Sequence, residues 1–228
     1  MQNSFFENAN CLNCNSNKNT IIYRFEEQES HFNIVKCECS FIYLTPRPTS
    51  LNIHKYYTEN YLPHKKNKSF NFFQKITFYW KRKMISKHIS KNATILDVGS
   101  GNCSFGTYMK MHGFSVDSYD KYNSSALSKL PKNKIYDVVT CWHSIEHFHD
   151  INNIFDSMMK ITNNKTMFFI ALPNFDSIDS RLFNSNWIAL DVPRHLFHFT
   201  SKTLSKYLKK YNISIVNKHR MFQDTFFN

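Results

Sequence analysis

The sequence contains no long hydrophobic run and no secretory signal. Its longest strongly apolar stretch, near residues 167–172, is far shorter than the roughly 20 residues that a membrane-spanning helix needs. The first ten residues, MQNSFFENAN, have neither a basic start nor an apolar stretch. With 42% hydrophobic and 16% aromatic residues, the composition is that of a globular chain rather than a disordered one. These observations predict a soluble, cytoplasmic protein.

Acidic side chains are also scarce, which gives the chain a formal net charge of +12. A basic chain of this kind invites the interpretation that it binds nucleic acid. However, asparagine, lysine, isoleucine, phenylalanine and tyrosine are all abundant, whereas glycine, proline and alanine are scarce. AT-rich codons produce that bias without any selection for a basic surface. Binding to nucleic acid is therefore the less favoured interpretation.

Glycine is also scarce, and its placement is informative. Only 4 glycines occur in 228 residues, and three of them lie in ILDVGSGNCSFG, residues 95–106. A buried strand that ends in a glycine turn and leads into a helix forms a nucleotide site, because glycine allows the tight turn and the helix N-terminus offers free N–H groups. We therefore expect Gly99, Ser100 and Gly101 to contact a nucleotide-like cofactor.

Two carboxylates indicate which cofactor this is. Asp97 comes two residues before the first glycine, and Asp120 follows Gly101 by 19 residues, at the end of the next predicted strand. Asp120 is placed to accept hydrogen bonds from ribose hydroxyls. Asp97 would repel a pyrophosphate but attract the ammonium group of S-adenosylmethionine. Because Ser104 replaces the third glycine of the G-x-G-x-x-G fingerprint, an NAD-dependent oxidoreductase is the weaker alternative.

Strand-like and helix-like segments alternate from residue 93 onward. Strands are expected near 94–99, 114–120, 136–142, 166–172 and 213–222, and helices near 103–113, 149–162 and 201–212. This alternation is typical of an α/β fold, in which helices cover both faces of a parallel sheet. Residues 93–228 are accordingly predicted to form a Rossmann-like domain.

Residues 51–92 are predicted to be a helical connecting region. Apolar groups recur at roughly helical spacing through SFNFFQKITFYWKRKMISKHI, residues 69–89. The mixture of aromatic and basic residues in this segment also suits a membrane surface. Its basic and apolar groups are not cleanly separated, so a helix packed on the neighbouring domain is the favoured interpretation.

Residues 1–50 contain short β-type segments around two close cysteine pairs. Cys11 and Cys14 form a C-x-x-C pair, and Cys37 and Cys39 form a C-x-C pair. Such spacing is typical of metal ligands, and four thiolates make a closed structural zinc site. We predict a zinc-ribbon-like module. A metal-free knuckle is the alternative, because the second pair is one residue shorter than usual.

The chain resembles the class I S-adenosylmethionine-dependent methyltransferases. The resemblance rests on LDVGSGNCSFG, on DSYD with Asp120, on YDVVTCWHSIEHFHD and on TMFFIALPN. Within that class it is similar to the ubiquinone-type O-methyltransferases, through the four cysteines, the segment with Tyr56, Tyr57 and Tyr61, and the late segment NWIALDVPRHLFHFT. The resemblance implies methyl transfer to a small-molecule acceptor, at oxygen.

Two histidines are the candidate bases for such a reaction. His147 closes the motif H-x-x-E-H at residues 143–147, directly after a predicted strand, and His195 lies in a loop after the strand at 166–172. A histidine that titrates near neutrality can take a proton from a hydroxyl group. H-x-x-E-H also matches an inverted zinc-protease motif, but its position at a strand end argues against a protease.

Two features depart from the family pattern. Cys103 stands where the family usually has glycine, and its side chain could narrow the cofactor pocket. The family fold also ends in a hairpin that completes the sheet, whereas this sequence ends with DTFFN soon after the strand predicted at 213–222. An unpaired sheet edge is therefore expected. A non-catalytic truncated relative and a zinc-ribbon nucleic-acid-binding protein are the alternative interpretations.

Overall fold

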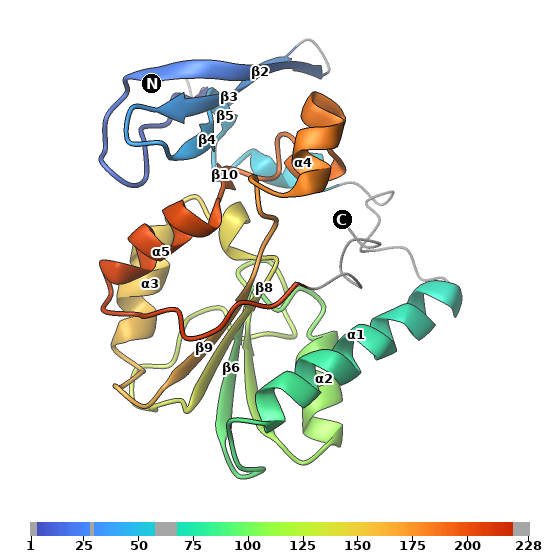
Figure 1. The fold of residues 1–228 in the computed structure, drawn as a ribbon. Helices are drawn as coiled ribbons and strands as arrows, with labels where there is room; N and C mark the ends of the chain where they lie inside the picture. The colour runs from blue at the N-terminus through green and yellow to red at the C-terminus, as the bar shows by residue number, and fades with distance from the viewer. Residues whose placement is uncertain (1–3, 28–29, 58–67, 221–228) are drawn as a thin grey trace.

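The structure is a computed structural model that describes residues 4–27, 30–57 and 68–220. In this part of the chain there are two sheets of four strands each and one pair of two-residue strands (Figure 1). One sheet belongs to an N-terminal module, and the other carries helices on both of its faces (Figure 1).

The N-terminal module is an antiparallel sheet. Its strand order is β10-β4-β3-β2, formed by Phe197–His198, Ile42–Leu44, Ser30–Cys37 and Asn19–Glu27. The short strands β1 (Phe6–Glu7) and β5 (Arg47–Pro48) pair with each other beside it. The strand-like segments expected in residues 1–50 are thus confirmed. The fourth strand, β10, was not expected, because it comes from the distant end of the chain.

The second sheet is parallel and Rossmann-like, as predicted. Its order is β7-β6-β8-β9, formed by Ser115–Tyr119, Thr94–Val98, Val138–Trp142 and Met167–Ala171. β6 and β8 are buried along nearly all of their length, because their branched apolar residues are covered by helices on both faces. After β6 the chain forms β7 on one side of β6, and then crosses over to form β8 on the other side. This change of direction creates a crevice at the carboxyl ends of the strands, where ligands bind in such sheets.

Helices cover both faces of this sheet. α1 (Lys68–Ser86) and α2 (Ser104–Met111) lie on one face, and α3 (Ile151–Met159) and α5 (Ser201–Lys209) lie on the other (Figure 1). α4 (Ile178–Phe183) lies beside the N-terminal module (Figure 1). Single 3-10 turns complete the order: η1 (Ile53–Tyr56), η3 (Ile145–His147), η4 (Asn184–Asn186) and η5 (Ile188–Leu190).

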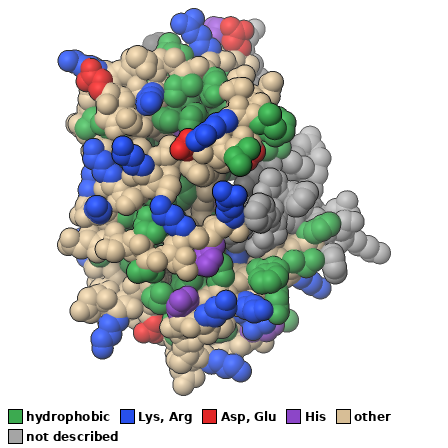
Figure 2. Space-filling view, viewed as in Figure 1, with side chains coloured by type: hydrophobic (Ala, Val, Ile, Leu, Met, Phe, Trp, Pro, Cys, Tyr) green, Lys and Arg blue, Asp and Glu red, His purple; other side chains and the backbone are tan. Residues whose placement is uncertain are grey.

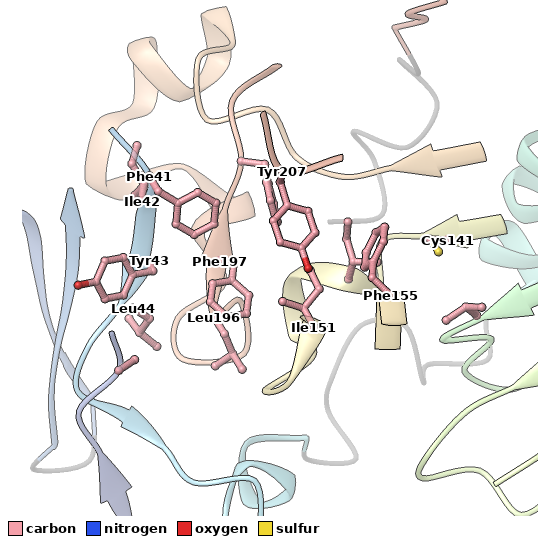
Figure 3. Close-up of a cluster of buried hydrophobic side chains, with 14 of the residues drawn as sticks. Phe41, Ile42, Tyr43, Leu44, Cys141, Ile151, Phe155, Leu196, Phe197 and Tyr207 are labelled. Carbon is pink, nitrogen blue, oxygen red and sulfur yellow. The ribbon is translucent and has the colours of Figure 1, made fainter. Parts of the chain in front are cut away.

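A continuous hydrophobic core joins the module to the parallel sheet. Phe41 of the module packs against Phe197 and Phe199, with ring centroids 6.0 and 5.3 Å apart. Phe199 in turn contacts Tyr207 of α5, which packs edge-on against Phe155 of α3. Figure 3 shows most of these side chains in one cluster that runs from β4 to α3. The two sheets are therefore joined by side-chain packing as well as by strand β10.

The prediction of a strand at 213–222 is wrong for the residues that the structure describes. Residues 213–220 contain no strand, although Ile213 and Ile215 still pack against the core. A strand needs a neighbour with which to exchange hydrogen bonds. In the described ranges, β9 pairs only with β8, so the sheet edge expected to lack a partner does lack one there. Residues 221 and 222 lie outside the described ranges.

Residues 51–92 were expected to form a helical connecting region. It contains η1 and α1, while residues 58–67 fall outside the described part of the chain. Among the described helices, none is both long enough and apolar enough to cross a membrane.

Candidate functional site

The glycine turn lies between β6 and α2. Gly99 and Gly101 have φ values of +71° and +53°, in the left-handed region that glycine adopts readily. The backbone N–H groups of Gly99 and Ser100 both donate to the carbonyl of Tyr119, at 2.8 and 3.1 Å. The turn is therefore fixed to the carboxyl end of the neighbouring strand, β7.

Gly99 also permits a close approach to the segment after β8. A Cβ atom at Gly99 would lie only 2.3 Å from the Cβ of Ser144. Ser144 is buried and donates from its hydroxyl to the carbonyl of Val98, at 2.9 Å. The turn and the H-x-x-E-H segment thus meet at the crevice between β6 and β8.

Asp120 lies against the turn. Its Oδ2 accepts the N–H of Gly101 at 2.9 Å, and its Oδ1 accepts the N–H of Tyr122 at 2.9 Å. The side-chain amide of Asn123 donates to the carbonyl of Gly101. Each carboxylate oxygen has a second lone pair, so Asp120 keeps the capacity to accept hydrogen bonds from a ribose.

Asp97 lies beneath the turn and is only 2% exposed. It accepts a hydrogen bond of 2.7 Å from the hydroxyl of Thr140 on β8. Burial raises the pKa of Asp97 to about 6, against the opposing effects of Thr140 and Lys81, and Asp120 adds to the rise. The two carboxylates predicted to hold the cofactor therefore lie close enough to interact.

Cys103 takes up the conformation that the family pattern would assign to glycine. Its φ is +61°, and it directly precedes α2. Its Sγ lies 3.6 Å from the hydroxyl of Ser100 and 3.5 Å from the side-chain amide of Asn123. The thiol thus packs against the turn.

Two cavities lie elsewhere on the molecule. One, of about 760 Å³, is lined by residues 17–20, 36–38 and 40 of the N-terminal module. The other, of about 440 Å³, lies between that module and the segments around α4 and the start of α5. Neither of these two cavities is lined by the glycine turn.

A cluster of histidines and a glutamate follows β8. The imidazoles of His147 on η3 and His195 in the late loop meet edge-to-face, with centroids 4.6 Å apart. His147 Nδ1 lies 3.0 Å from the carbonyl of Arg194, and His195 Nδ1 lies 2.9 Å from the carbonyl of Ala189. A carbonyl only accepts, so Nδ1 of His195 carries the proton. His147 Nδ1 also lies 3.1 Å from the hydroxyl of Tyr57, which can donate or accept, so the tautomer of His147 depends on the direction of that bond. Nε2 of the neutral His195 ring therefore carries a lone pair, and the neutral His147 ring carries one on whichever nitrogen lacks the proton.

Glu146 is buried beside these two histidines and is 1% exposed. Neither of its carboxylate oxygens has a hydrogen-bond partner among the described residues. His143 Nδ1 lies 3.7 Å from Oε1, beyond hydrogen-bond distance. Burial favours the neutral acid, but His143 and the imidazoles of His147 and His195 outweigh it and lower the pKa of Glu146 to about 2.

The loop that carries His195 is braced on several sides. The guanidinium of Arg194 forms a bidentate ion pair with Asp191 and donates to the carbonyl of Tyr56 at 3.0 Å. The N–H of Leu196 donates to the carbonyl of Glu146 at 2.9 Å. These bonds bring a loop near residue 195 against a segment near residue 146, and so fix the histidine cluster.

The cluster has two chemical capacities. Burial, and then the charge of His195, lower the pKa of His147 to about 4, so His147 is neutral at pH 7 and offers a lone pair, but it is a weaker base than an ordinary histidine. One ligand atom from each of Glu146, His147 and His195 lies within 4.8 Å of the others, so the same groups could hold a divalent cation. The sequence pointed to the two histidines. The sequence did not single out Glu146 as a ligand, although Glu146 is the glutamate of the H-x-x-E-H motif. It also did not indicate that His198 is buried nearby.

The four cysteines of the module converge as predicted. Their sulfur atoms all lie within 4.8 Å of one another, with Cys11–Cys39 and Cys14–Cys37 Sγ distances of 3.5 and 3.4 Å. Zinc–sulfur bonds of about 2.3 Å in a tetrahedron place sulfurs roughly 3.8 Å apart, so the set fits zinc. Burial opposes ionisation of Cys39, but hydrogen bonds from Asn13 and Phe41 outweigh it and lower its pKa to about 6.

Comparison with known proteins places this geometry in context. The profile of a family described as a methyltransferase domain matches residues 52–218. Among solved structures, the chain is similar to a 1,6-didemethyltoxoflavin N1-methyltransferase from Burkholderia thailandensis, with S-adenosylhomocysteine bound. The identity is 12%, the match covers 87% of this chain and 91% of that one, and the TM-score is 0.58.

A magnesium protoporphyrin IX methyltransferase from Synechocystis PCC 6803 is more distantly similar. Its identity is 12%, its coverage is 72% of this chain and 84% of that one, and its TM-score is 0.47. No curated protein sequence matches the chain.

Proposed function

This chain belongs to the methyltransferase domain family, an S-adenosylmethionine-dependent class of Rossmann-like fold, and we propose that it methylates an oxygen atom of a small-molecule acceptor. One observation supports the donor site above all. Asp120 accepts the N–H of Gly101 at the carboxyl ends of the parallel strands, with Asp97 buried directly below. This arrangement offers a ribose acceptor and a carboxylate for an ammonium group in one place.

The donor would be held by the turn and its two carboxylates. Asp97 would attract the ammonium group, while Gly99, Ser100 and Gly101 would let the donor approach the backbone. Asp120 would accept hydrogen bonds from the ribose hydroxyls through its remaining lone pairs. S-adenosylmethionine would supply a methyl group already activated by its sulfonium, so the protein has mainly to align donor and acceptor.

The acceptor oxygen would be activated by the histidine cluster. In the transfer, the oxygen forms a bond to the methyl carbon as the carbon–sulfur bond breaks, and the hydroxyl proton passes to a base. His147 or His195 is the proposed base, because each neutral imidazole has one ring nitrogen with a lone pair. The neighbouring Glu146 would stabilise the imidazolium that results.

A bound divalent cation is the second candidate role for the same cluster. The observation that favours it is the buried carboxylate of Glu146, whose two oxygens have no hydrogen-bond partner among the described residues. Glu146, His147 and His195 would be the ligands, and a cation would lower the pKa of an acceptor hydroxyl bound to it. Elemental analysis distinguishes the roles: a cation lost from Glu146→Gln but retained by Cys37→Ser belongs to this cluster.

Calorimetric titration with S-adenosylhomocysteine tests the donor site. The folded protein should bind it, and Asp120→Ala should weaken binding by about 1.5–3 kcal/mol, the contribution of a hydrogen bond to a charged group. Asp156→Ala, at an exposed aspartate on α3, is the matched control and should bind normally. No heat from folded protein, together with binding of NADH, would favour an oxidoreductase instead.

The methylated atom needs a separate test, because the similar Burkholderia enzyme is an N1-methyltransferase. Paired acceptors that differ only in a hydroxyl or an amine should be offered with labelled donor, and the products identified by mass spectrometry. Labelled methyl groups on the hydroxyl-bearing acceptors alone would support transfer to oxygen. Label on the amines alone would overturn that part of the proposal.

A further inference from the structure

Helix α1 packs through one face and exposes the other. Phe78 contacts Phe105 and Tyr108 of α2, with centroids 5.5 and 5.6 Å apart. Tyr79 and Trp80, the next residues along the helix, are instead 43% and 46% exposed. Packing on the Rossmann-like sheet therefore accounts for the inner face of α1 and leaves two large aromatic side chains facing solvent.

The exposed face of α1 is also strongly basic. Lys75 and Lys83 on the helix, and Lys87 just after it, are exposed. The sequence has no aspartate or glutamate between Glu59 and Asp97. Figure 2 shows basic and hydrophobic side chains next to one another over α1, with no acidic side chain among them.

The basic and aromatic groups are interleaved rather than separated. Lys83 Nζ lies 5.2 Å from the ring centroid of Trp80, and the guanidinium of Arg82 lies 5.5 Å from that of Tyr79. Amphipathic aromatic rings and long cationic side chains favour the boundary between lipid headgroups and acyl chains. At that boundary the aromatic ring is buried among the lipids while the ammonium group of a neighbouring lysine reaches a lipid phosphate.

We propose that the outer face of α1 docks on a membrane surface rich in anionic lipid. Tyr79 and Trp80 enter the headgroup region, and Lys75, Lys83 and Lys87 pair with lipid phosphates. The helix lies along the surface, with its inner face still packed on α2. The inference does not depend on methyl transfer, because docking needs neither donor nor acceptor.

Charge complementarity favours lipid over a second copy of the chain. An isologous contact through this face would bring the same cations of two chains together, and like charges oppose such a contact. Nucleic acid would also neutralise the lysines. However, the exposed aromatic rings and the lysines lie side by side on one helix. This arrangement fits the flat surface of a membrane better than it fits the separated bases of a nucleic-acid strand.

Co-sedimentation with phospholipid vesicles tests the proposal directly. The full chain should bind vesicles containing phosphatidylglycerol, bind much more weakly to pure phosphatidylcholine, and dissociate as salt is raised. Lys83→Glu/Lys87→Glu should lower the partition coefficient by at least about 25-fold, because each lysine near an anionic surface contributes roughly a factor of five and the glutamates add repulsion. Tyr79→Ser/Trp80→Ser should also weaken binding to the vesicles, and the binding that remains should be more sensitive to salt.

The matched control is Lys160→Glu/Lys165→Glu, which makes the same change in net charge at exposed lysines around the end of α3. It should bind vesicles nearly as well as the natural sequence. Equal losses from the two charge variants would assign the effect to net charge and overturn the role of α1. Circular dichroism establishes that every variant is folded.

Two further outcomes would contradict the proposal. One is equal binding to anionic and neutral vesicles, which would leave no role for the lysines. The other is absence of vesicle binding together with salt-dependent binding to a labelled RNA or DNA duplex that Lys83→Glu/Lys87→Glu abolishes. That result would assign the face to nucleic acid.

Discussion

Gly99 and Gly101 both have positive φ, but their surroundings differ. A side chain at Gly101 would meet no atom within 4 Å, whereas one at Gly99 would clash with Ser144. Gly101→Ala should therefore destabilise the fold by about 1 kcal/mol, the backbone cost alone. Gly99→Ala adds steric overlap and should cost about 3 kcal/mol. Urea unfolding followed by circular dichroism measures both; equal losses would contradict the close approach of the turn to Ser144.

Asp97 gives the proposed donor site a specific dependence on pH. Because its pKa is raised to about 6, it is ionised at pH 7.5 and becomes neutral as the pH falls through 6. Affinity for S-adenosylhomocysteine should therefore drop by up to tenfold per pH unit below 6. Asp97→Asn should bind weakly with no such dependence, whereas Asp120→Ala should retain it. Titrations between pH 5 and 7.5 provide the measurement.

The same raised pKa has the opposite effect on the stability of the unliganded chain. The folded state binds the Asp97 proton more tightly than the unfolded state, whose carboxyl has a pKa near 3.8. The contribution of Asp97 therefore becomes more favourable as the pH falls from about 6 toward 3.8. Donor binding and stability should respond in opposite directions over this range.

Among the elements, the parallel strands were predicted well from the sequence. β6, β8 and β9 coincide with apolar segments that turn residues delimit, so the period and length of each run were sufficient. α3 was recognised because its buried side follows a helical period, and Asp150 caps it by accepting the N–H of Asn153.

Two elements show why other parts could not be predicted. β10 has only two residues and exists because it pairs with β4, more than 150 positions earlier. Residues 213–216 alternate between half-buried and exposed positions like an edge strand, yet form no ladder in the described structure. A local pattern records a side-chain preference, whereas a strand also requires a partner.

The start of α5 offers a test at the scale of one element. Thr200 and Thr203 form a reciprocal cap, in which each side chain bonds to the backbone of the other. Thr200→Ala should lower the free energy of unfolding by about 1 kcal/mol, because a backbone N–H at the helix start loses its acceptor. Lys202→Ala, within the same turn but outside the cap, should change it by less than about 0.5 kcal/mol. Chemical denaturation compares the two.

Across the whole molecule, the zinc-ribbon-like module and the Rossmann-like sheet share one core. Cys37 is buried in the same cluster that contains Phe41, Phe155 and Tyr207. Chelation of zinc, or Cys37→Ser, should therefore lower the stability of the entire chain in one cooperative transition. Near-ultraviolet circular dichroism, which also reports on Trp142 of β8, should change together with the far-ultraviolet signal. Cys103→Ser is a control, because it alters a cysteine outside both the metal set and this core cluster.

Two separate transitions, with the signal from Trp142 unaffected by chelation, would contradict a shared core. The module would then fold independently of the parallel sheet, despite the contacts between Phe41 and Phe199.

The candidate site was predictable to different degrees. The two carboxylates were found because a glycine turn and a strand end fix their distance along the sequence. His147 and His195 were named individually, but their contact depends on a loop placed by Arg194, Asp191 and Tyr56. No local pattern carries that tertiary information.

The pairing of β10 with β4 also bears on how the chain assembles during translation. The amino-terminal module is synthesised first, but its fourth strand ends at residue 198. A nascent polypeptide must therefore hold an unfinished antiparallel sheet until nearly the whole Rossmann-like region has left the ribosome. Closing that sheet and bringing His195 beside His147 become one late step, because β10 begins only two residues after His195.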